Sequence, residues 1–318
     1  LMLGQQQLSL IAAAYKSDGL YARVTVIENW QRLLQYVVGF TCCFFAGTVT
    51  SFVAGFVITY LAFVVFMAVD LRRQRPWITW GRSHASWEEV KPLVKPALSF
   101  AAYPFGIALN LQAMIWVINL SLGPVQGYWS AMRTLSRAVI QVAQIFIGPA
   151  PVEISAALGR DDRLLAQRIH HSVLQAGLLA SAVACSGLAL FGRPIFELFT
   201  KGKYEYGIGL FLLFLGVALL NSAWNVSMSV AYAVNRHMAL TIAYLAANGA
   251  AFIIGVLMAK SAGLEGLAFA LLAVDALMVV IVLRKALTIL QETPGGLMRA
   301  LAQNPLTLLK RLKSETKA

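Results

Sequence analysis

The chain has 318 residues, of which 59% are hydrophobic and 13% charged, and its formal net charge is +12. So few charged residues leave too little polar surface for a globular protein in water and are typical of an integral membrane protein. The basic residues gather between apolar segments, which favours a role in membrane topology over nucleic-acid binding, so we expect no nucleic-acid partner.

Residues 1–71 are predicted to form membrane helices. Residues 1–15 are interpreted as the end of one helix, and 22–46 and 50–71 are apolar enough for two further spans of about 20 residues or more. The sequence starts inside an apolar segment, without an initiator methionine or a signal peptide. We therefore expect that it lacks an N-terminal part of its protein.

A polar, basic and aromatic segment follows at 72–92. It mixes arginines with Trp77, Trp80 and Trp87. Trp prefers the membrane–water interface and Arg attracts anionic lipid, so this segment is predicted to be a cytoplasmic linker at the level of the lipid headgroups. Nucleic-acid binding is the alternative for such a segment, and the flanking spans disfavour it.

Residues 93–291 are predicted to form a bundle of six membrane helices. The six spans cover residues 93–121, 126–158, 164–192, 206–234, 238–260 and 264–290. Pro149 and Pro151 predict a kink in the second span. The fold class is therefore an all-α integral membrane protein, with about eight complete transmembrane helices and a partial helix at the N-terminus.

The last segment, 292–318, is predicted to be a basic cytoplasmic tail. Its leucines and basic residues favour an amphipathic surface helix over 297–313, interrupted at Pro305. The tail and the linker share one side of the predicted membrane with most of the 26 lysines and arginines. Because basic residues concentrate on the cytoplasmic side, the C-terminus is placed there. The basic residues predicted on the opposite side are Arg193, Lys201, Lys203 and Lys260.

A weak internal repeat links the two parts of the chain. Residues 14–22 parallel residues 231–239, an offset of 217 positions, and each segment leads into two more predicted spans. Both segments lie on the predicted cytoplasmic side, so the repeats run parallel. The repeat predicts a parent protein with two six-helix bundles, of which the second is complete in this chain.

Two arginines stand in the apolar segment 126–158. Arg133, Arg137, Gln141 and Gln144 fall within an arc of about 80° on a helix, so they share one face. A double-arginine face is costly in a membrane unless it meets water, protein or an anionic ligand. We interpret it as a binding site for phosphate or pyrophosphate, with the glutamines near hydroxyl groups. The alternative is that the arginines reach the interface or pair with an acid.

Further polar residues lie within the later spans. Asn221, Asn225 and Tyr232 share one helix face, which suits a sugar ring or, alternatively, hydrogen bonds between helices. Asp275 stands near the middle of its span and is a candidate for proton or sodium coupling, with a structural hydrogen bond as the alternative. Asn110 faces away from the other amides of its own predicted helix.

Motifs for catalysis and nucleotide binding are absent. The patterns G-x-x-x-x-G-K-[ST], H-E-x-x-H and G-x-S-x-G do not occur. Cys42, Cys43 and Cys185 lack the spacing of a metal site. We therefore expect no enzyme activity, no catalytic residue, no metal and no other cofactor, and any transport has to be secondary or coupled through another protein.

The chain resembles the polysaccharide-biosynthesis (O-antigen type) flippases of the multidrug/oligosaccharidyl-lipid/polysaccharide exporter superfamily. The resemblance covers the arrangement of spans over the whole chain, with a basic linker between two helical bundles. Three runs carry it: Pro104-Phe105-Gly106 to Asn110; Gly127-Tyr128 with Ala131-Met132-Arg133-Thr134-Leu135; and Pro151 with Glu153-Ile154-Ser155 before the turn Gly159-Arg160-Asp161-Asp162.

The resemblance implies flipping of an undecaprenyl-pyrophosphate-linked oligosaccharide across the bacterial inner membrane, for lipopolysaccharide or exopolysaccharide biosynthesis. Family members use cavity arginines for the pyrophosphate, which Arg133 and Arg137 match in type and position. The implied partners are the lipid-linked oligosaccharide, membrane lipids and other polysaccharide-assembly proteins. A drug/cation antiporter of the same fold is the alternative. A membrane polymerase or glycosyltransferase that uses a lipid-linked sugar is disfavoured, because the sequence has no large loop with a separated acid pair.

Overall fold

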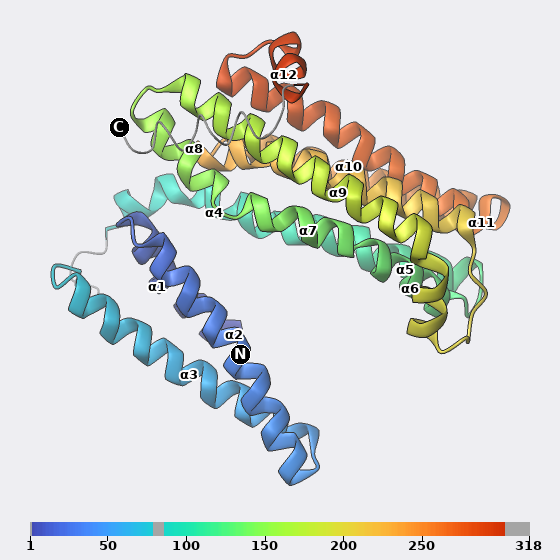
Figure 1. Cartoon of the computed structure of the whole chain (residues 1–318), viewed down its shortest axis with the longest axis horizontal. Coiled ribbons are helices and arrows are strands. Elements are labelled where there is room, and N and C mark those ends of the chain that lie inside the picture. The colour runs from blue at the N-terminus through green and yellow to red at the C-terminus, as the bar shows by residue number, and fades with distance from the viewer. Residues whose placement is uncertain (1, 79–85, 303–318) are drawn as a thin grey trace. The chain divides into compact units, whose positions relative to one another are not determined.

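A computed structural model describes residues 2–78 and 86–302 (Figure 1). The chain forms two compact units, Leu1–Ser86 and Trp87–Ala318. Every regular element among the described residues is a helix, which confirms the all-helical class. Within these residues, 6 helices are long and apolar enough to cross a membrane, which indicates a multi-pass membrane protein. The predicted number of eight spans is not confirmed.

The six membrane-length helices belong to both units. They are α3 (Val49–Gln74), the stretch Phe100–Ser121, the stretch Gln126–Gly159, α9 (Arg163–Thr200), α10 (Ile208–Ala233) and α11 (Met238–Leu290). The stretch Phe100–Ser121 contains the last part of α4 (Trp87–Ala108), a π-helical turn at Leu109–Ala113 and α5 (Met114–Ser121). The stretch Gln126–Gly159 contains α6 (Gln126–Ser136), α7 (Ala138–Ile147) and α8 (Ala150–Gly159).

The predicted span over 22–46 is not among the six. It forms α2 (Tyr21–Ala46), which is long enough to cross, but its middle carries Asn29, Gln31, Arg32 and Gln35. Two of these, Gln31 and Gln35, are buried inside the first unit. Polar side chains that pack against neighbouring helices lower the mean hydropathy of the segment, so it differs from the apolar α3.

The first unit consists of α1 (Met2–Ser17), α2 and α3, joined by an ion-paired cluster. Arg23 donates two hydrogen bonds to Asp70, from Nε to Oδ2 at 2.9 Å and from Nη2 to Oδ1 at 2.7 Å. The buried Tyr15 donates from its hydroxyl to the same carboxylate at 2.7 Å. Charge-assisted pairs of this bidentate kind are the strong ones. They hold the α1–α2 turn against the end of α3.

The two segments of the predicted repeat end their helices alike. After α1, Gly19 adopts a φ of 77°, and after α10, Asn235 adopts a φ of 53°. In both turns a backbone N–H reaches back five residues at 2.9 Å, from Leu20 to the Tyr15 carbonyl and from Arg236 to the Ala231 carbonyl. This is the hydrogen bond of a Schellman cap. The equivalent positions therefore lie 216 residues apart, from 19 to 235, one fewer than the sequence pattern indicated. The twelve-helix parent remains a prediction.

The predicted kink near the proline pair is present as a helix break. α7 ends at Ile147 and α8 begins at Ala150, with Pro149 in the cap position. Between α6 and α7, by contrast, Arg137 keeps helical backbone angles (φ −66°, ψ −15°), and the Gln141 N–H donates to the Arg137 carbonyl at 3.2 Å, so the helix continues there. Helix α9 runs 38 residues to Thr200, past the predicted end at 192. Arg193, expected in a loop, lies within this helix and pairs with Glu197 one turn later at 2.9 Å.

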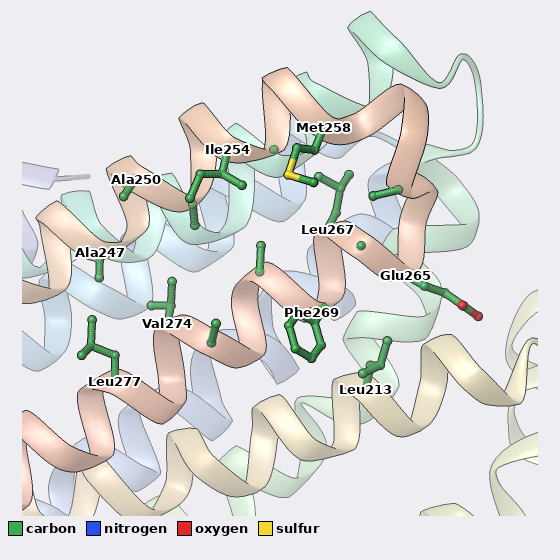
Figure 2. A pocket seen from close by; sticks show the side chains of 16 residues that line it. Leu213, Ala247, Ala250, Ile254, Met258, Glu265, Leu267, Phe269, Val274 and Leu277 are labelled. Atoms are coloured by element: carbon green, nitrogen blue, oxygen red, sulfur yellow. The ribbon is translucent and has the colours of Figure 1, made fainter.

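Helix α11 reverses direction at Gly263. That residue has φ 59° and ψ −159°, a conformation that glycine alone adopts readily. The two arms, 238–262 and 264–290, match the predicted spans 238–260 and 264–290. They lie side by side in Figure 2, and the Leu267 side chain packs within van der Waals reach of Gly255. One continuous helical stretch thus contains two antiparallel arms.

The segment after α11 is held by one face of α9. Gln167 donates to the Leu290 carbonyl at 2.9 Å, and Gln175 donates to the Leu301 carbonyl at 3.0 Å. Between them, His171 Nε2 lies 2.6 Å from Glu292 Oε1. The docked segment contains α12 (Pro294–Leu301). The rest of the predicted amphipathic helix 297–313, from residue 303 on, lies outside the described residues.

The segment between α3 and α4 is shorter than the predicted linker 72–92. The first residues of that linker complete α3, which ends at Gln74, and its last residues begin α4 at Trp87. Trp77 and Trp87 are exposed. Trp80 lies outside the described residues, so the placement of this segment at the headgroup level stays a prediction.

Candidate binding cavity

Many polar residues of the second unit line one partly open cavity of about 180 Å³. Its walls come from α4, the π-helical turn, α6, α7, α10 and both arms of α11. The polar residues that line it are Tyr103, Asn110, Arg133, Ser136, Arg137, Gln144, Asn221, Asn225, Tyr232, Tyr244 and Asp275. A cavity with this lining, inside helices of membrane length, is a candidate binding site.

Arg133 is the buried cation of the cavity. Its side chain is 6% exposed, and its Nη2 donates to Asn110 Oδ1. Asn110 Nδ2 donates in turn to Asn248 Oδ1 at 2.7 Å, and Asn248 Nδ2 donates to the Tyr244 carbonyl at 2.9 Å. These amides fix one edge of the guanidinium. Its Nη1 is buried and has no hydrogen-bond partner among the described residues.

The π-helical turn explains how Asn110 reaches Arg133. Leu109–Ala113 forms one wider turn between α4 and α5, and Asn110 and Ala113 are its buried members. Such a turn shifts the helix face relative to a regular α-helix and recurs at functional sites. Regular helical spacing predicted that Asn110 faces away from Gln112, and Asn110 is buried while Gln112 is exposed. The spacing did not identify Arg133 as the hydrogen-bond partner of Asn110.

Asp275 is the buried anion of the cavity, with 1% of its surface exposed. Its Oδ1 accepts hydrogen bonds from Trp224 Nε1 at 2.6 Å and from Asn221 Nδ2 at 2.9 Å. Asn225 Nδ2 donates to Asn221 Oδ1 at 2.6 Å, and the Tyr103 hydroxyl donates to Asn225 Oδ1 at 3.2 Å. Asp275 is therefore the end of a hydrogen-bonded chain along α10.

Most of the residues predicted from the sequence meet at this cavity. Arg133, Arg137, Gln144, Asn221, Asn225 and Asp275 all line it. Gln141 does not: its side chain is exposed and it is not among the lining residues. On a helix it lies furthest round from Arg133 among the four predicted residues. The roles of these residues in binding or coupling stay predictions.

Three contributing residues were not identified as candidates from the sequence: Tyr103, Tyr244 and Asn248. Trp224 was recognised only as the aromatic residue beside the face of Asn221, Asn225 and Tyr232. Asn248 carried a usable signal, since it stands alone among apolar residues of its arm. The aromatic residues carried none, because Tyr and Trp in a membrane helix more often lie at the interface or in the core. Tyr103 and Tyr244 pack against each other with ring centroids 5.5 Å apart, and Trp224 and Tyr244 with centroids 5.3 Å apart.

The two adjacent histidines of α9 lie away from the cavity. His170 Nε2 is 3.2 Å from the Ser227 hydroxyl, and His171 holds Glu292. Both are buried. The described part of the chain gathers no three His, Cys, Asp or Glu side chains in an arrangement that could hold a metal ion.

Comparisons with protein-family models, with curated proteins and with solved structures gave no match to this chain.

Proposed function

We propose that the chain belongs to a secondary transporter that flips an undecaprenyl-pyrophosphate-linked oligosaccharide across the bacterial inner membrane for surface or exopolysaccharide biosynthesis. The observation that supports this most is Arg133. A buried guanidinium with a free Nη1 in a membrane cavity needs an acceptor, and phosphate oxygens supply one. Arg137 lines the same cavity, so two cations face one small space.

The cavity size suits part of such a substrate. About 180 Å³ holds a phosphoryl group with a few waters, and it is too small for an oligosaccharide. The proposal therefore assigns the pyrophosphate to this cavity and leaves the sugars to a space that opens when the transporter changes conformation. Asn221 and Asn225 offer amides to the first hydroxyl groups.

The proposal includes membrane orientation and partners. The basic residues of the linker and tail favour a cytoplasmic C-terminus. The partners are the lipid-linked oligosaccharide, membrane lipids and other polysaccharide-assembly proteins. The chain acts in transport, not in catalysis, and no cofactor takes part.

The test uses the full-length protein in cells whose surface polysaccharide depends on it. Replacing both arginines, Arg133→Ala with Arg137→Ala, should abolish surface polysaccharide while the protein stays in the membrane. Each lost charge-assisted contact should weaken pyrophosphate binding about 10- to 100-fold. Arg160→Ala, at an exposed loop residue, is the matched control and should leave polysaccharide unchanged. Normal polysaccharide in the double variant, at normal abundance, would overturn the proposal.

One observation favours a second candidate, a drug/cation antiporter of the same fold. Asp275 is buried in the same cavity, among the rings of Tyr103, Tyr244 and Trp224, and aromatic rings beside a carboxylate suit an organic cation. This candidate predicts that the protein confers resistance to cationic dyes, that Asp275→Asn removes it and that Arg133→Ala does not. The flippase proposal predicts instead that Arg133 is required for transport.

A further inference from the structure

A second hollow lies between the two arms of α11, separate from the polar cavity. It is a groove of about 730 Å³, and Figure 2 shows its side chains on both arms and on Leu213 of α10. Its lining is apolar except at one end. There Glu265, next to the reversal at Gly263, is the one charged residue among the described residues that line the groove.

The groove opens outward from the helical bundle. Its rim consists of bulky side chains that are about half exposed, Ile254 at 48%, Met258 at 52%, Phe269 at 62% and Leu277 at 49%. Its floor consists of small residues, such as Ala251 and Gly255. In helices apolar enough to cross a membrane, such a groove faces lipid, and an apolar group has to fill it.

The length of the groove is comparable with one half of a bilayer. On one arm its lining runs from Ala247 to Ala262 and on the other from Glu265 to Leu277, so the two walls are about 22 Å and 18 Å long. The hydrocarbon core of a bilayer is about 30 Å thick, so each leaflet accounts for about 15 Å. The groove therefore extends from the level of Glu265 to the middle of the membrane.

We propose that this groove binds an acyl chain of an aminophospholipid, with the ammonium of its headgroup at Glu265. A carboxylate at the headgroup end attracts a primary ammonium and repels an anionic headgroup. The exposed Lys260 lies at the same end of the hairpin, where the lipid phosphate would be. The site does not depend on what the polar cavity carries.

The acyl part of the proposal is tested with the full chain in vesicles that contain phosphatidylethanolamine with a photoactivatable acyl chain. Ala250→Trp and Ala273→Trp place an indole in the groove at exposed positions, and each should remove most of the labelling of α11 peptides. Ala276→Trp is the matched control: it is exposed on the same arm and outside the groove, so labelling should stay as in the wild type. Equal labelling of all three variants would overturn the proposal that the groove binds an acyl chain. Cross-linking of two chains through these arms, in place of lipid, would also overturn it.

The headgroup part is tested by competition. Unlabelled phosphatidylethanolamine should displace the probe about two- to fivefold better than phosphatidylglycerol, as one partly exposed ion pair allows. Glu265→Lys should reverse this preference. Because the Glu265 carboxylate also lies against Gly209 at the N-terminus of α10, Glu265→Gln is the milder variant and should abolish the preference. Equal competition by both lipids in the wild type would overturn the ammonium assignment.

Discussion

Arg133 and Asp275 line one cavity, and their hydrogen bonding differs. One oxygen of Asp275 accepts from an indole and an amide, so this carboxylate is stabilised by the protein itself. Arg133 has a donor left over, since a guanidinium carries five N–H groups and its Nη1 finds no described partner. A ligand with acceptor oxygens therefore adds most at Arg133.

Two substitutions at Asp275 should separate structure from coupling. Asp275→Ala leaves Trp224 Nε1 and Asn221 Nδ2 buried without an acceptor, so it should lower the free energy of unfolding by about 1–3 kcal/mol for each donor. Asp275→Asn retains an acceptor oxygen and should unfold within about 1 kcal/mol of the wild type. Thermal unfolding in detergent measures both.

The same Asp275→Asn variant lacks a titratable group in the cavity. Transport by this variant should no longer respond to a pH or sodium gradient in vesicles. If the wild type and the variant respond equally to either gradient, Asp275 is structural and takes no part in coupling.

At the scale of elements, the irregular turns position the cavity. The π-helical turn carries Asn110, which binds Arg133, and Gly263 folds the chain back between the two arms of α11. The apolar pattern predicted where helices lie and which faces are polar. It could not predict a one-residue change of helix phase, because that change arises from packing between helices. The hydrogen bond between Asn110 and Asn248 could therefore not be predicted from the sequence.

The reversal in α11 gives a stability prediction. Gly263→Ala puts a Cβ on a backbone with φ 59° and ψ −159°, which should cost about 1–3 kcal/mol of unfolding free energy. Gly249→Ala is the matched control in the same helix. A Cβ at Gly249 meets nothing within 4 Å, so this change should stabilise the chain by about 0.5–1 kcal/mol. Chemical unfolding of both variants checks the contrast, and a neutral Gly263→Ala would contradict the assigned backbone.

For the whole molecule, composition and charge predicted an all-helical membrane protein, which the described residues confirm, while the predicted number of eight spans is not confirmed. The polar part of α2 shows why: Gln31 and Gln35 are buried against protein, and a sequence does not state whether a polar residue meets water or another helix. The extension of α9 past residue 192 has a similar cause, since Arg193 is paired along the helix with Glu197.

Membrane orientation can be measured directly. In a chain whose own cysteines are replaced, Arg160→Cys and Arg236→Cys should react with a membrane-impermeant maleimide from the cytoplasmic side. Lys203→Cys should react from the opposite side. All three residues are exposed, so access is not limited by packing. Labelling of all three from one side would contradict the orientation derived from charge.

The second arm of α11 and the helix α10 each line both the polar cavity and the apolar groove. On α11, Val274 lines the groove and the next residue, Asp275, lines the cavity. On α10, Leu213 lines the groove and the next residue, Phe214, lines the cavity. A displacement of this shared wall changes both spaces at once. Occupancy of one should therefore alter the affinity of the other, and thermodynamic reciprocity requires the same factor in both directions.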